Sequence, residues 1–261
     1  EIRLSLVGSE MCIRDSALDN SSSEDHPGAS AAPPSGRWQA AKRMLTQSAR
    51  AGGDRANVSA AGRAYVRAKG GSRAAANAAV QGRTTAAHAA RFLGTLASGG
   101  LAAALDAIGL RNFIGRNAEV VFAAIANAIA PPGATLEEAA ARRAADEVLA
   151  RLYDERIGED GDTAPLERMS ETDVAEAVRG VISAYVYERW LEELGKSIES
   201  GAVSPAEAVK QEREMKLYVR DIVQLDVSNE DVLAFGRDPA HGQAVIQRLF
   251  DEAYAFLEDG R

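Results

Sequence analysis

The stretch from Arg83 to Leu152 constrains the fold of this chain most, because its apolar residues recur every three or four positions between Gly and Pro breaks. Such spacing predicts α-helices, which the breaks at Gly99–Gly100, Gly109 and Pro131–Gly133 separate. We therefore predict four helices joined by short connectors. Their inward-facing residues are expected to be Phe92, Leu93 and Leu96; Leu101, Leu105 and Ile108; Val121, Ile125 and Ile129; and Leu136, Ala140, Ala144, Val148 and Leu152.

Two helix starts carry the capping-box pattern, in which a hydroxyl and a carboxylate each accept a hydrogen bond from a free backbone N–H of the first turn. Thr135 and Glu138 have this spacing, and so do Ser204 and Glu207. In the second case Pro205 occupies the first helical position, which Pro favours.

Gly pairs separate three short basic helices that precede this core. The first is predicted over residues 37–50, and Asp54 can cap the second. Ser72 can cap a third helix, over residues 73–80, which Gly82 is expected to end.

The C-terminal part begins with an acidic loop, Gly158–Pro165, and continues with a long helix from Ser170 or Thr172 to about Ser200. The apolar stripe of this helix is wide enough for burial on two sides. It consists of Val174, Val178, Val181, Ile182, Tyr185, Val186 and Leu194. Three further helices follow, and the last of them starts at Asp238–Pro239.

Composition supports the same fold class. Hydrophobic residues make up 46% of the chain but aromatic residues only 5%, so Ala supplies much of the apolar content and favours closely spaced helices. We predict an all-α fold, an irregular multi-helix bundle of roughly eight to eleven helices with a disordered N-terminal tail. A basic-to-apolar helical core is expected over residues 37–157, and an acidic C-terminal helical region over residues 158–261 is expected to pack on it.

The N-terminal residues differ in character from the rest of the chain. Residues 1–16 resemble the translation of a sequencing adapter found in metagenomic gene assemblies, although a short strand over residues 2–7 is an alternative. Residues 17–36 are rich in Ser and Pro and predict a disordered tail. The only cysteine, Cys12, lies in the adapter-like stretch, which argues against a disulfide framework. No apolar run is long enough to span a membrane, and we expect a cytoplasmic protein.

Charge is distributed unevenly along the chain. Residues 37–91 contain eleven Lys or Arg residues and one acidic residue, whereas residues 92–261 contain seventeen basic and thirty-one acidic residues. A basic segment of this kind can dock on an acidic protein, bind nucleic acid, or pair with the acidic half of its own chain. The candidate partner-binding residues are Arg55, Arg63, Arg67, Lys69, Arg73 and Arg83.

No motif for catalysis or for a cofactor is present. The sequence has no phosphate-binding Gly-rich loop with its Lys, no HExxH and no Ser elbow. The adjacent acids Glu137–Glu138 and Glu192–Glu193 would point about 100° apart on a helix, so we interpret them as solvated faces. We predict no catalytic residues, no metal site and no cofactor.

Three segments together resemble the QatB family, the B component of the Qat antiphage defence system. They are Gly52–Gly100, Leu105–Val121 and Ile129–Leu149, and the resemblance covers about residues 37–200. It implies an operon that also encodes an ATPase, a TatD-like DNase and an enzyme similar to QueC of deazapurine synthesis.

The resemblance further implies a non-catalytic component that is a partner, or an N-terminally modified protein substrate, of the QueC-like enzyme. The adapter-like residues stand where the modifiable start would be, so we expect this chain to retain the docking domain without its natural tail. The alternative function is a basic, helical nucleic-acid-binding adaptor.

Overall fold

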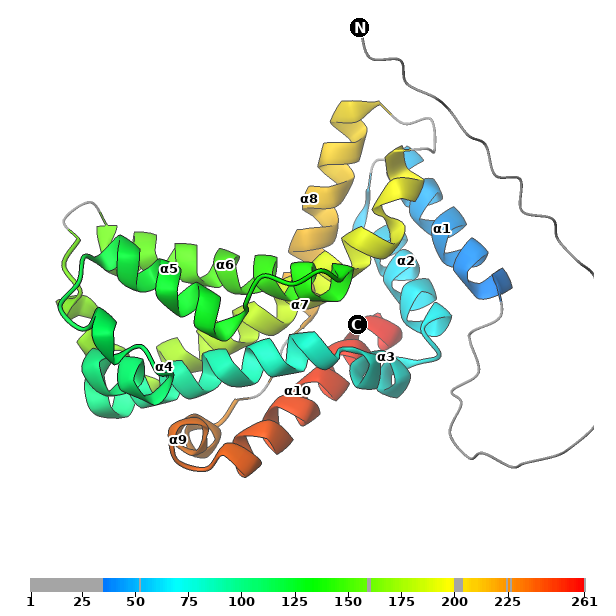
Figure 1. Cartoon of the computed structure of the whole chain (residues 1–261). Coiled ribbons are helices and arrows are strands. Elements are labelled where there is room, and N and C mark those ends of the chain that lie inside the picture. The colour runs from blue at the N-terminus through cyan, green and yellow to red at the C-terminus, as the bar shows by residue number, and fades with distance from the viewer. Residues whose placement is uncertain are drawn as a thin grey trace, which may run out of the picture. The chain divides into compact units, whose positions relative to one another are not determined.

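A computed structural model describes residues 35–51, 53–158, 161–199, 204–223, 225 and 227–260. All regular secondary structure in these ranges is helical, which confirms the all-α prediction (Figure 1). The predicted adapter-like stretch and most of the predicted tail lie outside them, and the first helix starts at Ser35. The α-helices are α1 (Ser35–Arg50), α2 (Arg55–Ala68), α3 (Ser72–Ala78), α4 (Val80–Ala107), α5 (Ala118–Ile129), α6 (Leu136–Arg156), α7 (Glu171–Glu199), α8 (Pro205–Ile222), α9 (Asn229–Arg237) and α10 (Pro239–Asp259).

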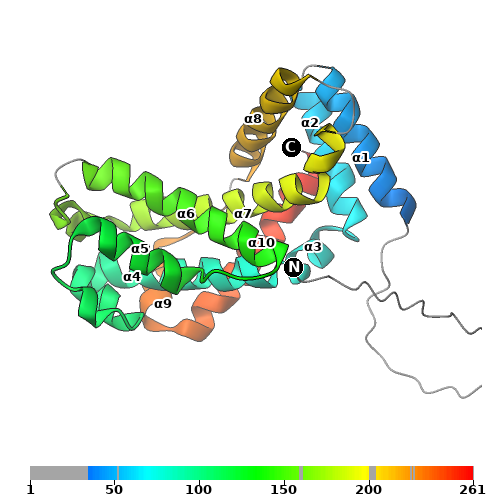
Figure 2. The ribbon, with the colours of Figure 1, turned by 45° about the horizontal axis from the view of Figure 1, so that its top comes forward.

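Helix α7 is the central element of this arrangement. It contacts α1, α4, α6, α8, α9 and α10. In both ribbon views α1, α2 and α8 gather near its C-terminal end, while α4 and α6 run beside the rest of it (Figures 1 and 2). All seven residues of its predicted apolar stripe are buried, so the predicted burial on two sides is confirmed.

The stretch that dominates the sequence pattern forms α4, α5 and α6, with a short 3₁₀-helix, η1 (Arg111–Phe113), after α4. Its predicted inward residues are buried or partly buried, with one exception. Leu136 is 70% exposed, so that prediction was wrong. It is the first residue of α6 and follows an exposed loop, residues 131–135, which leaves its side chain uncovered.

Local capping signals were accurate where the cap comes from the same turn. Thr135 with Glu138 and Ser204 with Glu207 both form complete capping boxes. Asp54 accepts a hydrogen bond from the backbone N–H of Asn57, as predicted.

The prediction for Ser72 was wrong. Gly71 occupies the cap position of α3, and the backbone N–H of Ser72 donates to the Glu258 carboxylate of α10 at 2.9 Å. This acceptor lies far away in the sequence, so no local pattern could identify it.

Two glycines in α4 behave differently from one another. Gly82 does not end a helix: it is buried inside α4 against the ring of Tyr185, where an added Cβ would lie 2.5 Å from ring atoms. Gly100 interrupts the helix as predicted, with φ at 79°. Just after this break, the backbone N–H of Leu101 donates to the carboxylate of Glu167 at 3.0 Å. Glu167 lies on the 3₁₀-helix η3 (Ala164–Arg168).

Helices α4 and α9 approach each other backbone to backbone. A Cβ on Gly94 would lie 3.0 Å from the carbonyl oxygen of Val232 and 3.1 Å from the backbone nitrogen of Gly236. A Cβ on Gly236 would lie 3.1 Å from the backbone nitrogen of Thr95. Because backbone atoms cannot rotate away as a side chain can, this spacing depends on both glycines.

Gly82→Ala is expected to destabilise the fold, since the new methyl group would collide with the Tyr185 ring. We expect a loss of about 1–3 kcal/mol in the free energy of unfolding, despite the higher helix propensity of Ala. The control is Gly36→Ala in α1, where a Cβ meets nothing within 4 Å. Urea denaturation of both variants measures the difference, and equal stability would contradict the close packing of α4 on α7.

Alkaline titration provides a second test of the core. Burial raises the pKa of Tyr65, Tyr185, Tyr187 and Tyr254 well above the usual value near 10. Above pH 10 the unfolded chain releases these protons and the folded chain retains them, so stability should fall as the pH rises further. Absorbance of tyrosinate should therefore increase for these four residues only together with loss of the helical circular dichroism signal. Their ionisation in an intact helical protein would contradict this packing.

Candidate functional site

The six candidate residues do not form one surface. Arg55, Arg63 and Arg67 lie on α2, and Lys69 directly follows it. Arg73 is exposed on α3, and Arg83 lies on α4. Only Arg63 and Arg67 line the same surface groove.

Two of the six residues bind the acidic half of their own chain. The Nη1 atom of Arg55 is 3.0 Å from Oδ2 of Asp221 on α8, in a solvent-exposed pair. The Nζ atom of Lys69 is 2.9 Å from Oε1 of Glu193 on α7, and these side chains are only 11% and 17% exposed. Lys69 also lies 5.5 Å from the centre of the Tyr65 ring. Lys69 thus connects the end of α2 to α7 within the fold.

Arg83 is also engaged within the fold. Its guanidinium donates to the side chain of Gln247 on α10, and to the carbonyl oxygen of Asn77 at 3.2 Å. Arg73 does not line the groove of Arg63 and Arg67. The predicted set therefore separates into three residues with partners inside the fold, the exposed Arg73, and the pair Arg63 and Arg67.

The half-buried Arg63 and the exposed Arg67 border a groove of about 610 Å³ between α1 and α2, which we call the α1–α2 groove. Arg63 and Arg67 stand one turn apart on α2, and Arg37 lines the groove from α1. Between them the lining is largely apolar, and Met44 is 39% exposed. The apolar lining is made by Ala40, Met44, Ala60 and Ala64.

The charge of the groove is mainly positive. Arg37, Arg63 and Arg67 have no hydrogen-bond or ion-pair partner within the described part of the chain. Glu258 also lines the groove, but its carboxylate accepts the N–H of Ser72. Unpaired guanidinium groups around an apolar floor can receive a segment that combines carboxylates with an apolar side chain.

The interpretation of Glu192–Glu193 as a solvated face was wrong. Both side chains are largely buried, and Glu192 is 10% exposed. Arg189 binds both carboxylates, with its Nη1 atom 2.9 Å from Glu192. Arg143 of α6 bridges Glu192 and Glu188, and Lys69 adds a bond to Glu193. These acids stabilise the contacts of α7 with α2 and α6, which adjacency in sequence could not reveal.

Glu137 and Glu138 have structural partners as well. Glu137 accepts hydrogen bonds from the backbone N–H of Gln81 at 2.8 Å and from the Tyr185 hydroxyl at 3.1 Å. Glu138 closes the capping box, and the backbone N–H of Thr135 lowers its pKa. Among the described residues, no group of three or more His, Cys, Asp or Glu side chains could hold a metal ion. Nor does any helix there have the length and apolar content to cross a bilayer.

Sequence reasoning missed Arg37 and Met44 as parts of the surface. The signal was present, because Arg37, Ala40 and Met44 share one face of α1 by their spacing. Ala60, Ala64 and the two arginines share one face of α2 in the same way. The sequence does not show that these two faces border the same groove.

The fold and this surface define an all-α protein whose candidate site is an exposed groove. A family model described as the Qat anti-phage system associated protein QatB matches residues 70–257. The chain therefore belongs to the QatB family and is a component of the Qat antiphage system. No curated protein and no solved structure matches it.

The family match differs in extent from the resemblance over residues 37–200. It starts after α2 and continues almost to the end of α10, so the C-terminal helices belong to the family's shared region. The arginines of the α1–α2 groove lie before the matched residues.

Lys69→Ala should destabilise the fold, whereas Arg67→Ala should leave its stability almost unchanged. Loss of Lys69 leaves the Glu193 carboxylate with one partner fewer, and we expect the free energy of unfolding to fall by about 1–3 kcal/mol. Arg67 is exposed, so its replacement should change stability by no more than about 0.5 kcal/mol. Urea denaturation measures both. A fully stable Lys69→Ala protein would return Lys69 to the candidate binding residues.

Proposed function

We propose that this chain acts in the Qat system as a non-catalytic cytoplasmic component, and that its partner is the QueC-like enzyme of the same operon. Membership of the QatB family carries the proposal. The resemblance implies that the B component is either bound or modified by this enzyme. The enzyme's chemistry uses ATP to activate a deazaguanine carboxylate for attack by an amine, and a backbone N-terminal amine is a suitable acceptor.

The position of the α1–α2 groove supports this function. The groove lies on α1, which is the first helix that the structure describes, and a partner held there would be tethered to the same chain that carries the amine. Tethering of this kind raises the effective concentration of the chain's N-terminal amine near the partner's active site. The remaining helices would then form the body that carries both the groove and the N-terminal segment.

The charge of the groove indicates the kind of surface that would bind there. Three arginines without described partners favour carboxylates, and the exposed Met44 favours an apolar side chain between them. We infer that the docking surface of the enzyme is acidic with an apolar centre. The operon ATPase and the TatD-like DNase are further partners that the resemblance implies.

The alternative function, a nucleic-acid-binding adaptor, is favoured by the same three arginines. Contacts of this kind to phosphates would make affinity fall with salt, with a slope of about −0.9 in log–log terms for each neutralised phosphate of duplex DNA. Binding to nucleic acid in the absence of the enzyme, with a slope near −3 that the groove variants reduce, would favour this alternative.

Charge reversal in the groove tests the docking proposal. The chain is co-expressed with the QueC-like enzyme; association is measured by pull-down and modification by intact mass. The variant Arg63→Glu/Arg67→Glu should lose association and any added mass, because it places two carboxylates opposite an acidic surface.

The matched control is Arg91→Glu/Arg116→Glu, which reverses two exposed arginines outside the groove and should bind like the wild type. Equal binding by the groove variant and the control would place docking on another face. If the wild-type protein neither associates with the enzyme nor changes in mass, the proposed partnership is wrong.

A further inference from the structure

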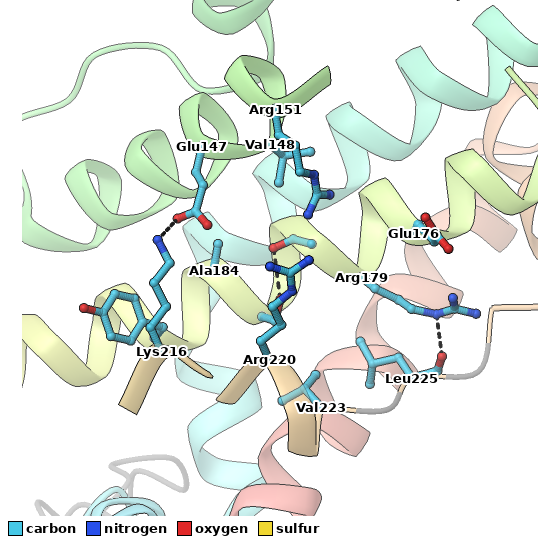
Figure 3. A pocket seen from close by; sticks show the side chains of 13 residues that line it. Glu147, Val148, Arg151, Glu176, Arg179, Ala184, Lys216, Arg220, Val223 and Leu225 are labelled. Atoms are coloured by element: carbon cyan, nitrogen blue, oxygen red, sulfur yellow. Dashed lines mark hydrogen bonds and ion pairs between the residues drawn. The ribbon is translucent and has the colours of Figure 1, made fainter. Parts of the chain in front are cut away.

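A second hollow of the molecule lies between α6, α7 and α8, well inside the family-matched residues (Figure 3). It encloses about 510 Å³, which is within the range of small-molecule sites. We call it the α6–α8 pocket. Its basic residues are Arg151, Arg179, Lys216 and Arg220, and its acidic residues are Glu147 and Glu176.

The positive charges of the pocket are incompletely neutralised. Lys216 pairs with Glu147, with Nζ 2.7 Å from Oε2. Arg151 is 3.9 Å from Glu155, which is a loose pair. Arg220 has no hydrogen-bond or ion-pair partner among the residues that the structure describes. Figure 3 shows the guanidinium groups of Arg151 and Arg220 pointing into the same space from α6 and α8.

A third arginine is held in place by the backbone. The Nε atom of Arg179 donates to the carbonyl oxygen of Leu225 at 2.7 Å, which fixes the side chain and leaves its terminal nitrogens available (Figure 3). Since a guanidinium presents five donors in a rigid fork, such an orientation prepares it for an oxyanion.

Gly180 provides the space for this cluster. A Cβ at this position of α7 would lie 2.9 Å from Nη2 of Arg151 and 3.2 Å from Cγ2 of Val148. Because Gly180 has no side chain, the Arg151 guanidinium can pack directly on α7. A larger residue at position 180 would displace it.

The pocket also has an apolar wall, formed by Val148, Ala184, Val223 and Leu225. The guanidinium groups of Arg151 and Arg220, which point into one space, repel one another, and a bound anion would relieve this repulsion (Figure 3). A phosphate offers several charged oxygens to several arginines at once, whereas a single carboxylate offers two. The volume leaves room for an organic body against the apolar wall.

We propose that the α6–α8 pocket binds a small organic phosphate of about nucleotide size, with a phosphate between Arg151 and Arg220 and with Arg179 as a further donor on the pocket wall. This site is separate from the α1–α2 groove and does not depend on the proposed docking function. Lys216 remains paired with Glu147 at the edge of the pocket, and Glu176 limits the positive charge on the other side.

The test is isothermal titration of the full chain with ATP and with tripolyphosphate, at constant ionic strength. Arg220→Glu should weaken ATP binding about tenfold or more, because it replaces an unpaired cation with a carboxylate. The control is Arg213→Glu, an exposed position two turns earlier on α8 that does not line the pocket, and it should bind ATP like the wild type. Tripolyphosphate should compete with ATP, since the phosphates provide the recognition.

Gly180→Ala is a second variant that leaves the net charge unchanged. It should keep the helical circular dichroism signal and weaken ATP binding, because the new methyl group displaces the Arg151 guanidinium. The proposal is overturned if neither ligand binds the wild type at millimolar concentration. It is overturned equally if Arg213→Glu loses as much affinity as Arg220→Glu, or if tripolyphosphate leaves ATP binding unchanged.

Discussion

Helix α7 must bury apolar side chains on more than one side at once, and the other helices are arranged around this requirement. Towards its C-terminal end Trp190 stacks on Tyr65 of α2, with ring centres 6.1 Å apart. On another side Tyr185 meets Phe250 of α10 edge-on at 5.6 Å. The ion pairs of Arg189 with Glu192 and Glu193 complete the surface that faces α2 and α6. Helices α1 and α2 are thereby anchored to the family-matched body through α7, and contacts with α8 and α10 add to this anchoring.

The uneven charge of the sequence is only partly cancelled by folding. Arg55 and Lys69 pair with acids of the C-terminal half, so the intramolecular alternative is correct for those two residues. The arginines of the α1–α2 groove do not pair in this way. A second cluster of arginines, in the α6–α8 pocket, lies within the part of the chain whose net charge is negative. The net charge of a long segment therefore does not show the local electrostatic fields that would act on a ligand.

The sequence was informative wherever the determining contacts are local. Capping boxes at Thr135 and Ser204, the stripe of α7 and the break at Gly100 all follow from residues within one or two turns. The errors at Ser72 and at Glu192–Glu193 have a different cause. Glu258 caps α3 and Arg143 binds Glu192 only because distant helices meet, and periodicity does not tell which helices do. The candidate site could be predicted only in part for the same reason. The residue spacing gives the faces of α1 and α2, but it does not show that these two faces border one groove.

The contact of Gly94 with Gly236 has a consequence for how this fold can change over evolutionary time. Each glycine leaves space that the backbone of the other helix occupies. A side chain gained at one position cannot be accommodated by trimming its opposite, which already has none, so the two helices would have to separate. Substitution at either position should therefore occur only in lineages where α9 has shifted on α4, and the pair should be kept or lost together.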